Sequence, residues 1–167
     1  MLPLVLNPVN LKVGLAGHGP ARERRAALLA EAGVEARLLP QAIPDELLAS
    51  LQVLFVAGLP ESEARDLATR ARGLRVLVNV EDVLPLCDFH VPAIVRRGDL
   101  LLTASTGGQV PGLARALRES LSDRFGPEWT ARLKELGRAR ARWRSEGLSP
   151  VEVSQHVRAL IARMGWL

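Results

Sequence analysis

Residues 11–19 read Leu-Lys-Val-Gly-Leu-Ala-Gly-His-Gly, and this stretch decides the fold class. Its first six residues form a β-type run, and its last three form a glycine-rich turn. The stretch 22–32 follows with small and apolar side chains at helical spacing, and Gly33 stands where a helix C-cap belongs. We therefore predict a strand, a tight turn and a helix, in that order.

The same alternation of strand and helix continues to residue 81. Apolar runs at 34–39, 53–57 and 76–80 are predicted strands, and the stretches 44–50 and 61–72 are predicted helices. Near-continuous apolar strands separated by helices are typical of a parallel sheet that is covered on both faces. The sequence thus predicts an α/β fold with a Rossmann-like parallel sheet. The sheet is reduced, because the crossover between the second and third strands is unusually brief.

The remainder of the chain has a different pattern. Residues 100–105 form another β-type run, and a helix follows Pro111. Two more helices are predicted, one from near Pro127 and one that opens with Ser-Pro-Val-Glu at 149–152, the spacing of a capping box. The last third is thus all-helical, and it is too small to bury a large core by itself. It must pack on the rest of the chain or on a second subunit, and a homodimer is one hypothesis.

Composition places the chain among globular proteins. Of its 167 residues, 48% are hydrophobic and 24% are charged, which excludes a disordered or fibrous chain. The single cysteine cannot form an internal disulfide or a four-cysteine zinc site. No apolar run approaches the roughly 18 residues of a membrane-spanning helix, and the start has no basic region of the signal-peptide type. We expect a soluble cytoplasmic protein.

The positive charge is concentrated in the last third. Residues 115–167 hold 11 basic and 6 acidic residues, whereas residues 1–114 hold 11 basic and 12 acidic ones. Such a split indicates a polyanionic partner, either nucleic acid or an acidic small molecule. The arginine run at 138–144 is most simply a solvated helix surface, because a nucleic-acid site would need more basic residues and aromatic side chains free to stack.

Three loops follow predicted strands, where ligands of open α/β sheets bind. The first is the turn 17–19, whose small residues and following helix suit a pyrophosphate. It is equally a tight structural turn, because Arg22 occupies the place of the signature's third small residue and residues 38–41 offer no carboxylate to a ribose. Arg22 could instead reach a phosphate. The second loop holds Asp82, and the third, residues 105–111, suits a carboxylate or a phosphate.

Taken together, these loops resemble one family. The chain has Asn-Val-Glu-Asp at 79–82, Cys-Asp-Phe-His-Val-Pro-Ala-Ile-Val-Arg-Arg-Gly at 87–98 and Ser-Thr-Gly-Gly-Gln-Val-Pro-Gly-Leu-Ala-Arg-Ala-Leu-Arg at 105–118. At this spacing they resemble the dehydrogenase and chelatase module of siroheme synthases, the precorrin-2 dehydrogenase / sirohydrochlorin ferrochelatase family. The opening Leu-Pro-Leu-Val-Leu-Asn at 2–7 and the helical stretch 24–33 are also similar to that family.

The resemblance implies a homodimeric enzyme of siroheme biosynthesis. Such an enzyme uses NAD to oxidise precorrin-2 to sirohydrochlorin, and many members also insert ferrous iron, which is then a substrate. It implies a Rossmann-like NAD-binding domain over residues 1–82, a small α+β dimerisation and substrate domain over 83–124 and a helical domain over 125–167. It also implies that the partner is a tetrapyrrole rather than nucleic acid or a membrane.

Site residues follow from the same resemblance. Asp82 is the expected catalytic acid or base, since removal of a hydride from the macrocycle must be accompanied by loss of a proton. The residues expected to bind the cofactor are Gly17, Gly19, Pro20, Ala21, Pro40, Gln41, Ala57, Gly58 and Asn79. Those expected to bind the substrate are Phe89, His90, Pro92, Ser105, Thr106, Gly107 and Gly108. No metal site is expected, because no cluster of His, Cys and carboxylates has metal-ligand spacing.

Departures from the family pattern all touch the cofactor side. The family's Gly-Gly-Gly-x-Val-Ala is here Gly-His-Gly-Pro-Ala-Arg at 17–22, and its Thr-Asp-Asp after the third strand is Gly-Leu-Pro at 58–60. Two alternatives therefore stay open. One is a chelatase that has lost its dehydrogenase function, and the other is a non-catalytic Rossmann-like protein that binds a tetrapyrrole or a nucleotide.

Overall fold

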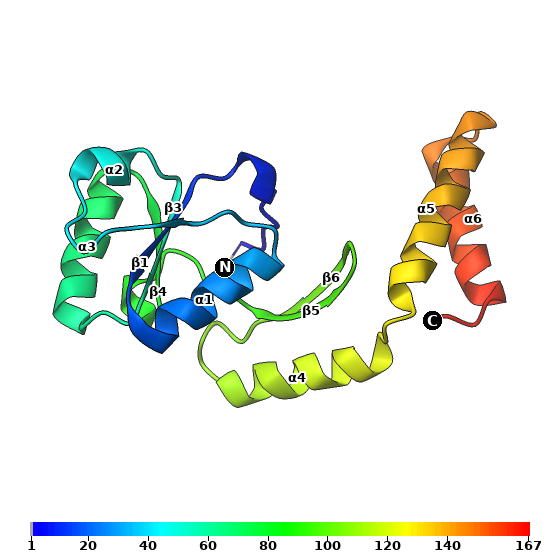
Figure 1. Cartoon of the computed structure of the whole chain (residues 1–167). Coiled ribbons are helices and arrows are strands. Elements are labelled where there is room, and N and C mark those ends of the chain that lie inside the picture. Colours follow the sequence, from blue (N-terminus) through cyan, green and yellow to red (C-terminus); the bar gives the residue numbers. More distant parts are fainter. Residues whose placement is uncertain (1) are drawn as a thin grey trace. The chain divides into compact units, whose positions relative to one another are not determined.

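The computed structural model describes residues 2–167, whose helices and strands are drawn in Figure 1. The chain divides into two compact units, the first ending at Val91 and the second running from Pro92 to Leu167. Residues 83–91 belong to the first unit, and the backbone N–H of Asp88 donates to the carbonyl of Val78 at 2.8 Å. The expected division into three domains, with boundaries after residues 82 and 124, stays a prediction.

The first unit is a four-stranded parallel sheet flanked by helices. The strand order is β2-β1-β3-β4, and every neighbouring pair is parallel, which confirms the predicted Rossmann-like sheet. The strands are β1 (Val13–Gly17), β2 (Arg37–Leu38), β3 (Val53–Ala57) and β4 (Leu77–Val80). The helices are α1 (Gly19–Glu31), α2 (Asp45–Ala49) and α3 (Glu61–Gly73), with 3-10 turns η1 (Pro8–Asn10) and η2 (Leu84–Leu86).

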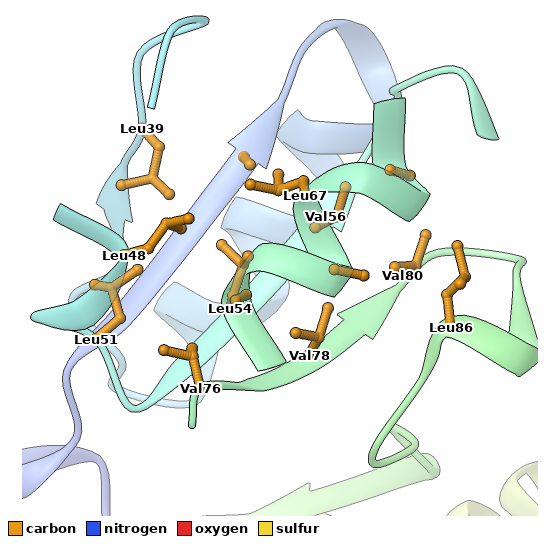
Figure 2. Close-up of a cluster of buried hydrophobic side chains, with 14 residues drawn as sticks. Leu39, Leu48, Leu51, Leu54, Val56, Leu67, Val76, Val78, Val80 and Leu86 are labelled. Atoms are coloured by element: carbon orange, nitrogen blue, oxygen red, sulfur yellow. The ribbon is translucent and has the colours of Figure 1, made fainter. Parts of the chain in front are cut away.

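Strand β3 shows how the sheet is buried on both faces. Its five residues, Val-Leu-Phe-Val-Ala, are all apolar and all buried, and successive side chains of a strand point to opposite faces. Val53 and Phe55 pack in one cluster with side chains of α1, whereas Leu54 and Val56 pack in a second cluster with side chains of α2 and α3 (Figure 2). Full burial of one such side chain contributes roughly 1.5–3 kcal/mol. One face of β3 therefore packs against α1, and the other packs against α2 and α3.

The crossover from β2 to β3 is short, as predicted. The expected strand at 34–39 is reduced to Arg37–Leu38, and Pro40, which has no N–H to donate to a ladder, follows closely. The chain after β2 then packs directly on the sheet. A Cβ added to Gly14 of β1 would lie only 2.5 Å from Cδ1 of Leu51. Glycine in this strand therefore makes room for the short crossover.

The second unit begins with an antiparallel hairpin and continues as helices. The sequence pattern predicted the second strand of the hairpin but not the first. Arg97 fastens the hairpin to the following helix, because its Nε donates to the carbonyl of Phe125 at 2.7 Å and its Nη2 donates to the hydroxyl of Ser122 at 2.9 Å. The elements are β5 (Ala93–Arg97), β6 (Leu100–Ala104), α4 (Pro111–Arg124), α5 (Trp129–Ser145) and α6 (Pro150–Arg163).

Tryptophan rings mark the packing of α5 and α6. Trp129, at the start of α5, is only 6% exposed, and its ring lies 6.5 Å from that of Trp166. The guanidinium of Arg132 lies over both rings, at 5.2 and 5.3 Å from their centroids. Helix α6 begins with the capping box, in which Ser149 and Glu152 each bond the other's backbone N–H. No helix within residues 2–167 is both long and apolar enough to span a membrane.

Candidate functional site

The carboxyl ends of β1 and β3 form the topological switch point of the sheet. The chain passes from β1 to β2 on one side of β1 and then returns to β3 on the other. In open α/β sheets, ligands bind in the crevice at such a point. Gly17 and Ala57 are register partners there, and both were predicted to bind the cofactor. The structure thus brings these two residues together.

Two turns meet at this point through bare backbone. A Cβ on Gly17 would overlap the carbonyl oxygen of Ala57, and a Cβ on Gly58 would overlap that of His18. The φ angles of the two glycines, 109° and 76°, also lie in the region that glycine favours. The turn after β1 and the turn after β3 therefore pack closely, with no side chain between them.

The start of α1 is an uncapped helix end that suits an anion. His18 makes no side-chain cap hydrogen bond, and the first turn has no acidic residue. The N–H groups of Gly19 and Ala21, in the first turn, have no acceptor within the helix, whereas Pro20 has no N–H. A Cβ on Gly19 would meet no atom within 4 Å. This end therefore fits the diphosphate of a dinucleotide, with one donor fewer than an ordinary helix start.

The chain after β2 supplies the next two predicted cofactor residues. Leu39 is 5% exposed, and its backbone N–H donates to a carbonyl of β1 at 2.9 Å. The chain therefore stays beside β1 for one residue beyond β2. Pro40 and Gln41 follow as exposed residues at the carboxyl end of β2.

Asp82 follows β4 in a left-handed conformation. Its φ of 61° is unusual for a residue other than glycine, and aspartate adopts this conformation with less strain than most residues. The side chain is exposed, and within residues 2–167 it forms no ion pair and no side-chain hydrogen bond. Its carboxylate is therefore open to contact by a ligand.

Glu81, the neighbour of Asp82, links the end of β4 to α1. Its backbone N–H donates to the carbonyl of Val56 at 2.9 Å and so continues the β3–β4 ladder. Its carboxylate lies 3.8 Å from the guanidinium of Arg25, which also lies over the ring of Phe55. The side chains of Arg25 and Glu81 are only 13% and 21% exposed. Sequence reasoning missed this pair, because its two members are brought together only by the fold.

The Cys-Asp-Phe stretch at 87–89 caps the free edge of β4. The carboxylate of Asp88 accepts hydrogen bonds from the backbone N–H of Val78 and from Nε of Arg72, both at 2.8 Å. The thiol of Cys87 donates to the carbonyl of Val80 at 3.1 Å, and its sulfur accepts from the N–H of Val80 at 3.3 Å. Because β4 is an edge strand, these bonds satisfy groups that would otherwise lack partners.

Asn79 supports the loop that carries two predicted substrate residues. It is 6% exposed, and its Nδ2 donates to the carbonyl of Phe89 at 2.9 Å. The ring of Phe89 meets that of Phe55 edge-on, with centroids 5.4 Å apart. Nδ1 of His90 is buried and has no hydrogen-bond partner among the described residues. The amide of Asn79, predicted to contact the cofactor, is therefore engaged in holding this loop.

The remaining predicted substrate residues belong to the second unit. Pro92 is its first residue, and the turn 105–108 joins β6 to α4. The hydroxyl of Thr106 accepts a hydrogen bond from the N–H of Val110 at 3.2 Å. Gly107 and Gly108 have φ angles of 66° and 79°, so this turn requires glycine at both positions. No three His, Cys, Asp or Glu side chains within residues 2–167 are grouped to hold a metal ion.

Comparison with known proteins connects the first unit to nucleotide binding. The profile of a family described as putative NAD(P)-binding matches residues 4–93. A siroheme synthase of Nitrosococcus oceani is 32% identical over 167 residues, covering 86% of this chain and 34% of the relative. One from Pseudomonas fluorescens is 32% identical over 169 residues, covering 89% and 36%. The chain thus spans about a third of the length of the curated relatives it matches.

A solved structure shares the fold. The chain resembles SirC, a precorrin-2 dehydrogenase, with a TM-score of 0.71 and 19% sequence identity. The match covers 96% of this chain and 89% of that one. The arrangement of strands and helices along nearly the whole chain is therefore that of a known fold.

Proposed function

Because the chain belongs to the family that forms the N-terminal module of siroheme synthases, we propose that it oxidises precorrin-2 to sirohydrochlorin with NAD. The single observation that carries the proposal is the switch point. There the bare-backbone turns of Gly17 and Gly58 adjoin the uncapped, acid-free start of α1. This is the arrangement that a dinucleotide diphosphate needs.

The cofactor side of the reaction belongs to the first unit. Bound NAD would supply the hydride acceptor for oxidation of the macrocycle. The N–H groups of Gly19 and Ala21 would hold its diphosphate, and Gly19 leaves open space beside them. Gly17, Ala57 and Gly58 would line the site as the close-packed turns after β1 and β3, and Pro40 and Gln41 would lie on the adenosine side. Pro20 fixes the backbone at the helix start but gives no hydrogen bond.

We assign Asp82 to accept the proton that is released when the macrocycle is oxidised. Oxidation of the macrocycle releases a proton with each hydride, and a positioned carboxylate can accept it. The exposed side chain of Asp82, free of ion pairs within the described residues, keeps this capacity. Asn79 contributes by holding the loop at Phe89 in place rather than by presenting a free amide.

Each unit, taken by itself, offers residues for contact with the substrate. In the first unit we assign Phe89 and His90 to contacts with the macrocycle, because both are half-buried residues of the loop after β4 and the ring of Phe89 is apolar. In the second unit the turn 105–108 offers hydroxyl and backbone donors to carboxylates of a tetrapyrrole, and Pro92 offers an apolar ring. No member of this set is assigned to a metal ion.

One assay tests the proposal. Purified full-length protein is given precorrin-2 and NAD, and absorbance at the NADH band is followed, together with the spectrum of sirohydrochlorin. We expect NADH to form in step with sirohydrochlorin. Absence of NADH formation at saturating substrate would overturn the proposal.

A chelatase without dehydrogenase activity is the second candidate function. It is favoured by Pro20, which removes a donor from the diphosphate site, and by the absence of a carboxylate at residues 38–41. In this case ferrous iron is a substrate, and Asp82 takes the pyrrole protons that the metal displaces. Sirohydrochlorin and ferrous iron, supplied without NAD, then give the siroheme spectrum, whereas precorrin-2 and NAD give no NADH. Retained tetrapyrrole binding with neither activity would indicate a non-catalytic binding protein.

We also propose that the protein works as a homodimer in the cytoplasm. Helix α4 and its N-cap Val110 carry a row of exposed apolar side chains, with Val110, Leu113 and Leu117 exposed by 50%, 50% and 43%. Exposed apolar rows of this kind mark protein–protein contacts. Leu113 and Leu117 lie on one helical face, which suits the same face of a second copy.

A further inference from the structure

We propose that the cofactor site does not discriminate between NAD and NADP, and that Gln41 is the residue responsible. In doubly wound sheets an acidic residue near the end of the second strand binds the adenosine ribose 2′-hydroxyl, and the same carboxylate repels the 2′-phosphate of NADP. Here a neutral amide takes its place. This inference rests on the dinucleotide site of the proposed function but not on its substrate or its reaction.

The position of Gln41 is fixed by the sheet. Strand β2 pairs with β1 through Leu38, and the N–H of Leu39 adds one more hydrogen bond to β1 at 2.9 Å. Leu39 is buried, and Pro40 then directs the chain away from the ladder. Gln41 is therefore the second residue to leave the sheet at the carboxyl end of β2, beside the strand that leads into the turn at Gly17.

No neighbouring residue in the sequence supplies the carboxylate that is missing at position 41. Residues 36–44 contain no Asp or Glu, and the next acidic residue is Asp45. Its carboxylate accepts hydrogen bonds from Nε and Nη2 of Arg70 on α3, at 3.0 and 2.6 Å. Arg70 also donates to the carbonyl of Ile43 at 2.6 Å, so the segment 43–45 is tied to α3. Asp45 is thus committed to another element.

The first turn of α1 carries no charge that would repel an added phosphate. Arg22 lies in the first turn of α1, is half-buried and forms no ion pair within residues 2–167. The first turn carries no acidic residue, so the positive end of the helix dipole is not neutralised. A 2′-phosphate therefore meets no fixed negative charge at position 41 and none in the first turn of α1.

Binding titrations test the inference without any turnover. The full-length protein is titrated with NADH and with NADPH, and the fluorescence of the reduced nicotinamide or the heat of binding is followed. We expect the two Kd values to agree within about tenfold. Binding of NADH more than about thirtyfold tighter than NADPH would overturn the inference, as would the absence of binding by either dinucleotide.

A second test of the inference uses a variant that adds a negative charge at position 41. Gln41→Glu is expected to weaken NADPH binding at least about tenfold relative to NADH, because it places a carboxylate beside the 2′-phosphate. The matched control is Gln155→Glu, which makes the same change on the exposed surface of α6 and leaves both Kd values unaltered. An unchanged NADPH/NADH ratio in Gln41→Glu would remove the residue from the site. Equal binding of both dinucleotides without oxidation of precorrin-2 would support the inference while the proposed function fails.

Discussion

Asp82 has an unusual backbone conformation and a proposed role in proton transfer. Substitution by asparagine keeps the first and removes the second. Asn adopts the left-handed region as readily as Asp, so Asp82→Asn is expected to change the free energy of unfolding by less than about 0.5 kcal/mol. An amide accepts no proton at neutral pH, so NADH formation should fall by about 10²–10⁴-fold. Rates from the precorrin-2 assay and chemical denaturation measure the two effects. The control is Asp66→Asn on the exposed surface of α3, and near-normal turnover by Asp82→Asn would disprove the assignment.

Cys87 offers a test of burial at the level of one side chain. Burial raises the pKa of its thiol above the ordinary value, although the hydrogen bond from Val80 acts in the opposite direction. The native state therefore favours the protonated thiol, and its contribution to the free energy of unfolding is lost as pH rises above about 8.5 through the raised pKa. At pH 8 a disulfide reagent should react at least about tenfold more slowly with the native protein than with the denatured chain. Equal rates would contradict the burial of this thiol.

At the scale of elements, the cap that residues 87–89 form on the edge of β4 can be tested by its effect on the free energy of unfolding. Asp88→Ala removes the acceptor of the Val78 N–H and of Arg72, and it leaves an edge of the sheet without partners. The expected loss in the free energy of unfolding is about 1–3 kcal/mol. Glu61→Ala is the control, because it removes an exposed pair with Arg65 and one of two acidic residues in the first turn of α3, and it should cost less than about 1 kcal/mol. Guanidinium denaturation of both variants measures the two free energies of unfolding. Equal losses would show that the cap stabilises the protein no more than an exposed ion pair does.

For the whole molecule, the sequence predicted those features of the fold that local residue patterns determine. The apolar run of β3 and the glycine turn at Gly17 predicted the parallel sheet, because strand burial and turn conformation are set by the residues themselves. Strand β5 was missed, since the two arginines that end it obscure the β-type pattern. The engagement of Asn79 and the pairing of Arg25 with Glu81 were also missed, because each depends on a partner supplied by tertiary packing.

Assembly is the property of the whole molecule that the exposed face of α4 predicts. The chain has a mass of 18.1 kDa, and light scattering at micromolar concentration should give twice that value. Leu117→Asp places a charge in the apolar row and should shift the mass to that of the monomer while the far-ultraviolet circular dichroism stays unchanged. Val151→Asp is the control, because Val151 is 67% exposed in the first turn of α6, where an acidic residue is favourable. A wild-type monomer, or a Leu117→Asp variant that keeps the dimer mass, would show that this face does not hold two copies together.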